Sequence, residues 1–294
     1  MSAGHPGAID VAATTAGTPL LPATPAEERA RELLRSLGSV VVAFSGGVDS
    51  SAVLGLAVAE LGAEHVLAVT SRSETYSPEE LETAVRVAAS LGVAHRVIET
   101  SELEIPRFAA NPPDRCYHCK GELFRELGAL ARAEGYTAVV DGANHDDRGD
   151  FRPGIRAADE LGVRHPLMEA GLGKEAVRTL ARRLGLSNWS KPAMACLSSR
   201  FPYGEEITRE KLAMVAQAES FLRDRGFAQL RVRHHGTLAR VEVPADELAR
   251  LVSVPTLREE LVGEFKRIGY HYVTLDLQGF RSGSMNEVLE GEWR

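Results

Sequence analysis

Residues 39–51 read SVVVAFSGGVDSS, and this stretch decides the fold of the chain. Its first six residues are mostly β-branched or aromatic, which is typical of a short buried strand. Two adjacent glycines let backbone N–H groups approach an anion, and the apolar residues 52–59 predict a helix whose positive end points to the same place. The stretch therefore predicts a strand, a phosphate-binding loop and a helix.

The loop offers groups for both a phosphate and a metal ion. Its donors are the backbone amides or hydroxyls of Ser45, Gly46, Gly47, Ser50 and Ser51. The carboxylate of Asp49 makes little sense for a phosphate alone, but it suits a Mg²⁺ ion that bridges phosphate oxygens. The spacing matches neither a Walker A loop nor a dinucleotide fingerprint. A tight turn without a ligand is the alternative interpretation.

The segment Ser45 to Ser51 resembles the SGGxDS loop of the ATP pyrophosphatase (PP-loop) superfamily. Members of that superfamily cleave ATP between the α- and β-phosphates and form an adenylated substrate. The resemblance implies that ATP and Mg²⁺ bind at this loop, with Asp49 as a catalytic and metal-binding carboxylate.

The bulk composition narrows the class of protein. A chain of 294 residues with 44% hydrophobic content can form one doubly wound domain and a smaller second one. The net charge of -7 does not favour a polyanionic partner such as tRNA. Three cysteines argue against a secreted disulfide framework, and no apolar run is long enough to span a bilayer. Residues 1–25 are rich in Ala, Thr, Pro and Gly and lack Lys and Arg, so they resemble neither a secretory signal nor a transit peptide. We therefore expect a disordered tail and a cytoplasmic protein.

Strands and helices alternate after the loop. We expect strands at 65–70, 95–99, 136–141 and around 164–167, and helices at 27–37, 78–91, 121–134 and 174–184. Three prolines predict irregular chain at 103–114. The alternation indicates an α/β fold with a doubly wound parallel sheet, which agrees with the PP-loop resemblance. The polar sequence 141–147 should then lie beside the phosphate loop, although Asp146 or Asp147 alone is more simply a helix N-cap.

The chain divides into four expected segments. These are a tail (1–25), a PP-loop ATP pyrophosphatase domain (26–190), a cysteine-bearing active-site loop (191–204) and a C-terminal α+β domain (205–294). The third segment has neither helical nor strand periodicity. In the fourth we expect helices at 209–225 and 257–268, and strands at 230–235, 238–243 and 270–277.

The three cysteines form a Cys-x-x-Cys pair, Cys116 and Cys119, and a distant residue, Cys196. Such a pair fits half of a zinc site, a thiol–disulfide couple or part of an iron–sulfur site. A Cys₃His zinc site would also need a histidine such as His118. Three thiolates on a [4Fe–4S] cluster would leave one iron able to hold an external sulfide. Coincidental buried thiols are the alternative, but a polar, proline-framed loop is a poor place for them.

The sequence KPAMACLSSRFPYG at 191–204 resembles the cysteine segment of the LarE family. These enzymes are the ATP-dependent pyridinium-3,5-bisthiocarboxylic acid mononucleotide synthases of the nickel-pincer cofactor pathway. The likeness continues through residues 141–147, 152–154 and 231–233. It implies that Cys196 is the sulfur-donating cysteine. The extra pair at Cys116 and Cys119 resembles the subset of the family with three cysteines, in which a [4Fe–4S] cluster is proposed.

The same resemblance implies substrate-binding residues. Arg231 and Arg233 fall where the family holds the phosphate and carboxylate of its substrate, and Arg200 is a further candidate. Alternating residues of a strand share one face, and guanidinium groups suit both anions. A solvated basic strand face is the alternative interpretation.

The reaction implied begins with attack of a pyridinium carboxylate on the α-phosphate of ATP. Sulfur would then come from Cys196 itself, leaving dehydroalanine, or from sulfide on a cluster held by Cys116, Cys119 and Cys196. A PP-loop tRNA thiolase is the nearest alternative enzyme, and a non-catalytic nucleotide sensor is the alternative from another class. We expect a small-molecule substrate, no nucleic-acid or membrane partner, and a homo-oligomer.

Overall fold

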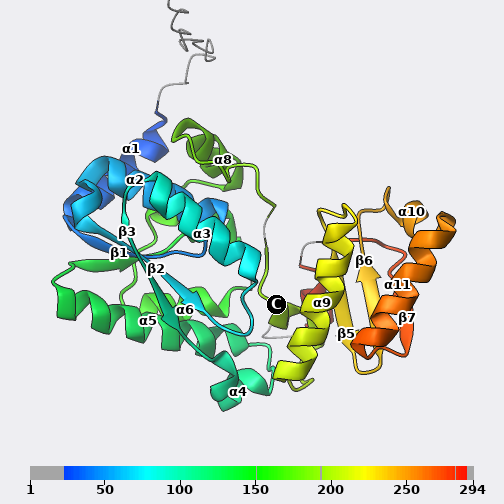
Figure 1. The fold of residues 1–294 in the computed structure, drawn as a ribbon. Coiled ribbons are helices and arrows are strands. Elements are labelled where there is room, and N and C mark those ends of the chain that lie inside the picture. The colour runs from blue at the N-terminus through cyan, green and yellow to red at the C-terminus, as the bar shows by residue number, and fades with distance from the viewer. Residues whose placement is uncertain (1–22, 150, 193, 282, 290–294) are drawn as a thin grey trace, which may run out of the picture.

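The computed structural model describes residues 23–149, 151–192, 194–281 and 283–289 (Figure 1). Its first sheet contains the strands β1 (Val40–Ala43), β2 (Val66–Arg72), β3 (Ala94–Glu99) and β4 (Ala138–Val140). They lie in the order β3-β2-β1-β4, and every neighbouring pair is parallel. The order reverses at β1, so the carboxyl ends of β1 and β4 flank the position where open parallel sheets bind ligands. This confirms the predicted α/β fold.

Helices cover both faces of this sheet (Figure 1). One face carries α1 (Pro25–Leu37), α2 (Val48–Leu61), α3 (Pro78–Ser90), α7 (Pro166–Ala170) and α8 (Lys174–Arg183). The other carries α5 (Arg115–Glu134) and α6 (Pro153–Glu160). Side chains alternate along a strand, so Val40 and Val42 join the core with the first group of helices, whereas Val41 joins the core with the second.

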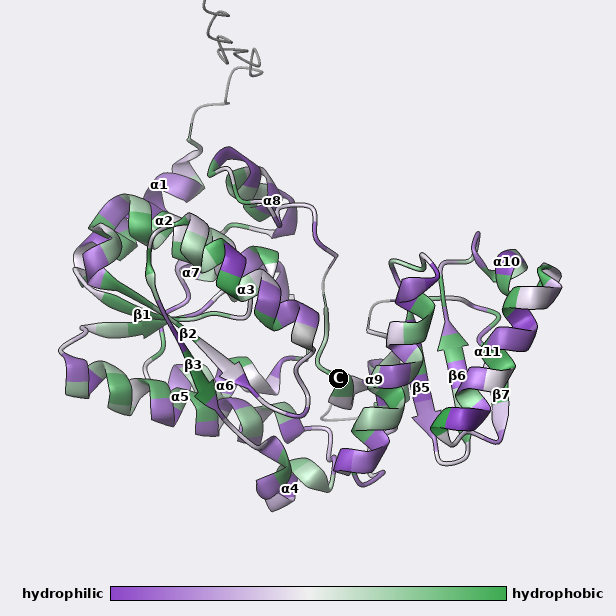
Figure 2. Ribbon diagram, in the orientation of Figure 1, coloured by the Kyte–Doolittle hydropathy of each residue, from purple (hydrophilic) through white to green (hydrophobic). Residues whose placement is uncertain are grey.

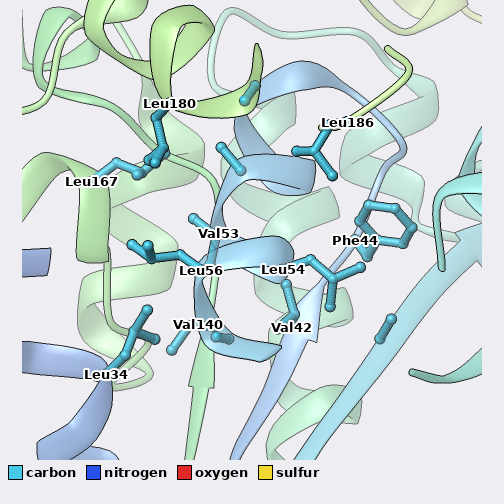
Figure 3. Packing of buried hydrophobic residues seen from close by; sticks show 14 of the residues in the cluster. Leu34, Val42, Phe44, Val53, Leu54, Leu56, Val140, Leu167, Leu180 and Leu186 are labelled. Carbon is cyan, nitrogen blue, oxygen red and sulfur yellow. The ribbon is translucent and has the colours of Figure 1, made fainter. Parts of the chain in front are cut away.

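Helix α2 is the central element of the larger core. Its side chains Val53, Leu54 and Leu56 are fully buried and lie among leucines from α1, α7 and α8 (Figure 3). Figure 2 shows that this helix is hydrophobic over most of its length, unlike the helices at the surface. Each buried leucine contributes about 1.5–3 kcal/mol. This packing fixes the beginning of α2, and therefore the phosphate loop.

The first helix begins earlier than the predicted tail allows. Thr24 caps α1 by accepting a hydrogen bond from the amide of Glu27 at 3.2 Å, and Pro25 occupies the first turn. Proline is well suited to that position because the first-turn N–H has no helical partner. The expected tail boundary at residue 25 is therefore wrong, and the remainder of that prediction, residues 1–22, lies outside the described residues.

The region 103–114 is more regular than its prolines suggested. It contains the end of a 3₁₀ turn (Glu102–Glu104) and the short helix α4 (Pro106–Ala109), and α5 begins at Arg115 instead of residue 121. Pro106 starts α4, where a missing N–H costs nothing. The Cys-x-x-Cys pair consequently lies in the first turn and a half of a helix, which corrects the expectation of a loop.

The predicted strand around 164–167 does not form. Arg164 makes a single parallel bridge with Val140, and α7 starts at Pro166. A proline cannot donate to a strand ladder but fits the first turn of a helix. The sheet therefore ends at β4, apart from this one bridge.

The C-terminal part forms a second sheet with its own core (Figure 1). Its elements are α9 (Arg209–Asp224), β5 (Arg231–His235), β6 (Leu238–Glu242), α10 (Leu248–Ser253), α11 (Pro255–Ile268) and β7 (Tyr272–Leu275). Strand β6 is central, antiparallel to β5 and parallel to β7. These elements confirm the predicted strands and helices, to which α10 is an addition.

Between α8 and α9 the described chain is mostly irregular, as the lack of periodicity at 191–204 predicted, except for the 3₁₀ turn Leu197–Arg200. Further 3₁₀ turns are Ala63–His65, His145–Gly149 and Ser284–Val288. A small hydrophobic cluster joins this segment to both parts, since it contains Phe108 beside α5, Leu197 and Phe201 in the segment, and Val215 of α9. Within the described ranges, every helix is too short or too polar to cross a membrane.

Candidate active site

The phosphate loop joins β1 to α2 as predicted, with Gly47 as the residue before the helix. Gly46 adopts φ 68, and a Cβ there would come within 2.9 Å of the backbone of Ala84, so both conformation and space require glycine. Among the described residues, no side chain caps the amides that begin α2. Those amides, together with the positive end of the helix, form an anion-binding site.

The three serines of the loop have different surroundings. The hydroxyl of Ser50 accepts a hydrogen bond from the Ser45 amide at 3.2 Å and donates to the Gly47 carbonyl at 3.2 Å. The hydroxyl of Ser51 is fully buried and accepts a bond from the Asn188 amide at 2.8 Å. Ser45 is exposed. Its hydroxyl lies 3.1 Å from that of Ser50 and accepts a hydrogen bond from the Gly47 amide at 3.4 Å. All three serines therefore help to shape the loop, and ligand binding by them stays a prediction.

Asp49 meets the loop that follows β4, as the sheet topology predicted. The amide of Asn144 donates to its carboxylate at 3.2 Å, and a Cβ at Gly142 would come within 2.6 Å of the Ser50 nitrogen. Burial raises the pKa of Asp49, and the nearby charge of Asp147 raises the pKa further. Two neighbouring carboxylates with a neutral amide donor are stabilised by a hard cation, so this residue set fits Mg²⁺.

The residue Asp146 also lies at this edge. Its carboxylate accepts a hydrogen bond from the Lys174 amide at 2.9 Å, at the start of α8. Asp146 is therefore not the N-cap residue that the alternative interpretation expected, because it lies within the 3₁₀ turn His145–Gly149 and the N-cap of α8 is Gly173. Two contributors that sequence reasoning missed are Asn188, which also donates to the Gly46 carbonyl at 2.9 Å, and Tyr76, which donates to the Ser45 carbonyl at 2.6 Å.

The cysteines come from two segments of the chain. Cys116 and Cys119 lie three residues apart in α5 and so share one helix face, whereas Cys196 precedes the 3₁₀ turn Leu197–Arg200 and is exposed. Burial raises the pKa of both helix thiols, and the charge of Cys196 raises the pKa of each further. Cys119 packs against the hydrophobic cluster that contains Leu197, the residue after Cys196.

This arrangement bears on the expected [4Fe–4S] cluster. In the described part of the chain, no three His, Cys, Asp or Glu side chains come close enough to hold a single metal ion. A cubane binds each thiolate through a different iron, so its ligands are farther apart than the ligands of one ion. The described residues therefore give no support to a Cys₃His zinc site, and the [4Fe–4S] cluster stays a prediction.

The arginines predicted to bind substrate are buried. Arg200 is 0% exposed and forms a bidentate ion pair with Glu219, at 2.7 and 2.8 Å. Arg233 forms the same kind of pair with Glu242, at 2.8 Å for both bonds. The alternative interpretation of a solvated basic strand face is therefore wrong, and direct substrate binding by these two guanidinium groups stays a prediction.

Arg231 differs from its neighbours. It donates to the Leu230 carbonyl at 2.7 Å and lies over the ring of Phe280. Burial lowers the pKa of Arg231 to about 10, and the positive charges of Arg200 and Arg233 contribute to that decrease. A guanidinium with a lowered pKa beside two others marks a place where an anion would be stabilised.

Arg200 also holds the cysteine loop. Its Nη1 donates to the carbonyls of Ala195 and Cys196, at 2.7 and 3.1 Å. The Arg233 guanidinium donates to the Ser199 carbonyl at 2.8 Å from the opposite side. The buried ion pairs of α9 and β6 therefore fix the backbone on both sides of the Cys196 turn.

The substitution Glu219→Gln tests this support. Removing the carboxylate leaves Arg200 charged and buried, and we expect a loss of about 3–5 kcal/mol in the free energy of unfolding. Denaturant unfolding with an unchanged slope measures it. The double variant Arg200→Met/Glu219→Leu, which removes both charges, should recover much of that loss, and a smaller loss in the single variant than in the double one would contradict the assignment.

A cavity of about 590 Å³ lies next to Asp147, lined by Arg148, Arg152, Arg156 and His165 among others. His165 is buried, and its two ring nitrogens face the carboxylates of Asp141, at 2.6 Å, and Asp159, at 3.2 Å. Burial lowers its pKa, but the hydrogen bond and charge of Asp141 and those of Asp159 outweigh this effect, and the pKa is raised overall.

His165→Gln should therefore destabilise the protein mainly at acidic pH. A pKa that is higher in the folded state stabilises folding fully below the unfolded value of about 6.5, and the contribution disappears as pH rises through the folded pKa. We expect the free energy of unfolding to fall by about 1–2 kcal/mol near pH 5.5 and by less near pH 9. The nearby Arg164–Glu169 ion pair remains charged at both pH values, so it does not cause this difference. Equal losses in urea titrations at the two pH values would refute the assignment.

The first strand of the parallel sheet is followed by an uncapped loop with two glycines, and the carboxylate of Asp49 faces a second polar loop at the switch point. These features are typical of the ATP-pyrophosphatase type of nucleotide-binding protein. A family model described as asparagine synthase matches residues 27–119, which contain that loop.

Comparison with known proteins identifies the family. The pyridinium-3,5-bisthiocarboxylic acid mononucleotide synthase of Lactiplantibacillus plantarum is 41% identical, over 87% of this chain and 92% of its own length. The uncharacterized protein slr1717 of Synechocystis sp. is 48% identical over 89% and 97%. The tRNA-specific 2-thiouridylase MnmA of Methylobacterium nodulans is 34% identical, but over only 52% and 50%. The chain belongs to the family of the pyridinium-3,5-bisthiocarboxylic acid mononucleotide synthases.

Proposed function

We propose that this protein is an ATP-dependent sulfurtransferase that adenylates a pyridinium carboxylate mononucleotide and converts it to a thiocarboxylate, a step in nickel-pincer cofactor synthesis. The observation that carries the proposal is the 41% identity to a synthase of that product over nearly the whole of both chains. The exposed thiol of Cys196 and the ATP-type loop supply the two chemical functions that such a reaction needs.

Adenylation uses the residues around the phosphate loop. The substrate carboxylate attacks the α-phosphorus of ATP, and pyrophosphate leaves toward the amides at the start of α2, where the helix dipole stabilises its charge. Asp49 and Asp147 would hold Mg²⁺, which neutralises the departing phosphates when bound. Asn144 orients the Asp49 carboxylate through its hydrogen bond. The product is an acyl adenylate, whose AMP is a good leaving group.

Cys196 is the thiol best placed to react with that intermediate. Burial keeps Cys116 and Cys119 protonated at neutral pH, whereas Cys196 is exposed. In the direct route its thiolate attacks the carbonyl carbon and AMP leaves, which forms a thioester. Loss of the Cα proton and cleavage of the Cβ–Sγ bond then release the thiocarboxylate and leave dehydroalanine at residue 196.

We favour a second route that uses all three cysteines. Cys116, Cys119 and Cys196 would hold a [4Fe–4S] cluster, and such a cluster supplies an iron without a protein ligand, able to carry an external sulfide. The count of three cysteines, split between the Cys-x-x-Cys pair and Cys196, is what motivates this assignment. In this route the three cysteines act only as ligands, and Cys196 keeps its sulfur atom.

The region of Arg200, Arg231 and Arg233 is proposed to hold the substrate's anionic groups. Arg200 and Arg233 are paired there with Glu219 and Glu242, and burial lowers the pKa of the neighbouring Arg231. The charges of Arg200 and Arg231 also reach Glu80 of α3, a helix of the phosphate-loop domain. An anion bound at Arg231 would therefore lie on the side of the C-terminal domain that faces the nucleotide.

We also propose a cytoplasmic homo-oligomer that acts on a small molecule, with neither nucleic acid nor membrane as a partner. The test of function combines the protein, ATP, Mg²⁺ and a pyridinium carboxylate mononucleotide under anaerobic reducing conditions. We expect AMP, pyrophosphate and a product in which one oxygen is replaced by sulfur. Pyrophosphate released only with tRNA would favour a tRNA thiolase, and ATP binding without turnover would favour a nucleotide sensor.

A further inference from the structure

The residue Asn111 combines a strained backbone with complete burial. Its φ of 55 is the one left-handed value among the non-glycine residues that the structure describes, and its side chain is 0% exposed. Asparagine tolerates this conformation better than most residues, but a buried amide also needs partners for its donors and its acceptor. A strained, buried asparagine indicates that both its backbone conformation and its side-chain hydrogen bonds are needed at this position.

Each of those groups is bonded to a different part of the chain. The side-chain nitrogen donates to the carbonyls of Phe201 and Pro202, at 3.4 and 2.7 Å, just after the Cys196 turn. The side-chain oxygen accepts from Arg115 Nη1 at 2.9 Å, and the backbone carbonyl accepts from the Gly204 amide at 2.8 Å. Asn111 therefore joins the segment after Cys196 to the first residue of α5.

Arg115 is the second unusual residue of this joint. It is 4% exposed and lies over the Tyr203 ring at 5.1 Å, and its Nε has no hydrogen-bond partner within the described residues. No carboxylate of the described chain forms an ion pair with it. It directly precedes Cys116 at the start of α5. Its contacts with the Asn111 side-chain oxygen and with the Tyr203 ring tie the start of this helix to the segment after Cys196.

We propose that Asn111 and Arg115 are positioning residues: Asn111 sets the spacing between the Cys-x-x-Cys of α5 and Cys196, and Arg115 holds the Asn111 side chain in the orientation that this spacing requires. This inference rests on the proposed use of the three thiols in sulfur transfer. Neither residue belongs to the phosphate loop or to the arginine region that is proposed to bind substrate. Their effect is on whether three sulfurs from two distant segments form one site for a soft, electron-poor ligand.

The alternatives at position 111 show why asparagine is needed. Glycine would relieve the backbone strain but lose three side-chain hydrogen bonds. Aspartate keeps the acceptor for Arg115 but would place a carboxylate where two carbonyls require a donor. Alanine would lose the bonds and add strain. If Asn111 determines the spacing of the thiols, each of these substitutions should change that spacing, and aspartate, which keeps one of the bonds, should change it least.

The test measures the thiols in the metal-free protein. In a Cys119→Ser background, the remaining thiols are Cys116 and Cys196, and dibromobimane becomes fluorescent only when it links two thiols. We expect Asn111→Gly to slow this cross-linking by about tenfold, and Asn111→Asp to give an intermediate rate. Labelling of Cys196 by monobromobimane should be unchanged, which separates spacing from reactivity, and thermal melting reports folding.

Arg115→Gln provides the independent arm. We expect it to slow the cross-linking of Cys116 to Cys196 as well, because the Asn111 side-chain oxygen loses its guanidinium donor. The matched variant Arg125→Gln, at an exposed position of the same helix, should not change that rate. Unchanged cross-linking in folded Asn111→Gly would overturn the proposal. If that variant does not fold, equal cross-linking rates in the two arginine variants overturn it. Neither outcome depends on product formation, so failure of the joint is distinguishable from failure of the proposed function.

Discussion

Asp49→Asn should lower the rate of pyrophosphate release by about 10²- to 10³-fold while changing the free energy of unfolding by less than about 1 kcal/mol. The carboxylate is half-buried, and its pKa is raised by burial and by Asp147. In the ligand-free protein its charge is therefore a cost, so neutralising it does not harm the fold. In the complex with ATP it has a partner, because Mg²⁺ requires oxygen ligands that carry charge.

A pyrophosphate assay at saturating Mg²⁺, together with denaturant unfolding, measures both quantities. Asp224→Asn is the matched control, because this residue is exposed at the end of α9 in the other domain, and we expect unchanged rates. A variant at Asp49 that releases pyrophosphate as fast as the wild type would remove this residue from catalysis. A variant that loses stability in proportion to activity would make its role structural.

The parts of the fold that follow from local sequence were predictable. Three features are adjacent in the sequence: the β-branched residues of β1, the glycine pair and the apolar residues of α2. The strand, the loop and the helix could therefore be assigned from the pattern of about 20 residues. The position of the loop after β4 followed from topology, since carboxyl ends of parallel strands share one edge. The start of α5 was missed because Arg115 to Lys120 has no apolar periodicity, and tertiary contacts of Arg115 and Cys119 secure that first turn instead.

The contacts that build the site were much less predictable. Asn144 reaches Asp49 across 95 residues, and Asn188 reaches Ser51 across 137. A neutral amide leaves no periodic or charge signal, so nothing in the sequence pairs these residues. Arg200 was read by resemblance as a substrate ligand, whereas its carboxylate partner is 19 residues away on another element. Ion-pair partners of this kind are set by packing and have no sequence signature.

Cys196→Ser should abolish thiocarboxylate formation in either sulfur route while leaving adenylation intact, because its thiol takes part only after pyrophosphate has left. The variants Cys116→Ser and Cys119→Ser separate the routes. If a cluster delivers sulfide, each variant should reduce repeated turnover by at least about 10²-fold, because the two thiolates that remain are too few to hold the cluster. If Cys196 donates its own sulfur, both variants should still complete one turnover, because the serines replace thiols that the direct route does not use.

The deciding measurement is made on protein expressed and purified without oxygen, first assayed for iron and sulfide and then for intact mass after reaction with ATP and substrate. We expect a brown protein whose mass is unchanged after several turnovers, and whose iron is lost in Cys116→Ser. An iron-free protein that works once and loses the elements of H₂S at residue 196 would establish the sacrificial route instead. The thiols of α5 would then be half-buried helix residues without a part in sulfur transfer, and their raised pKa values, which keep them protonated, would prevent them from competing with Cys196.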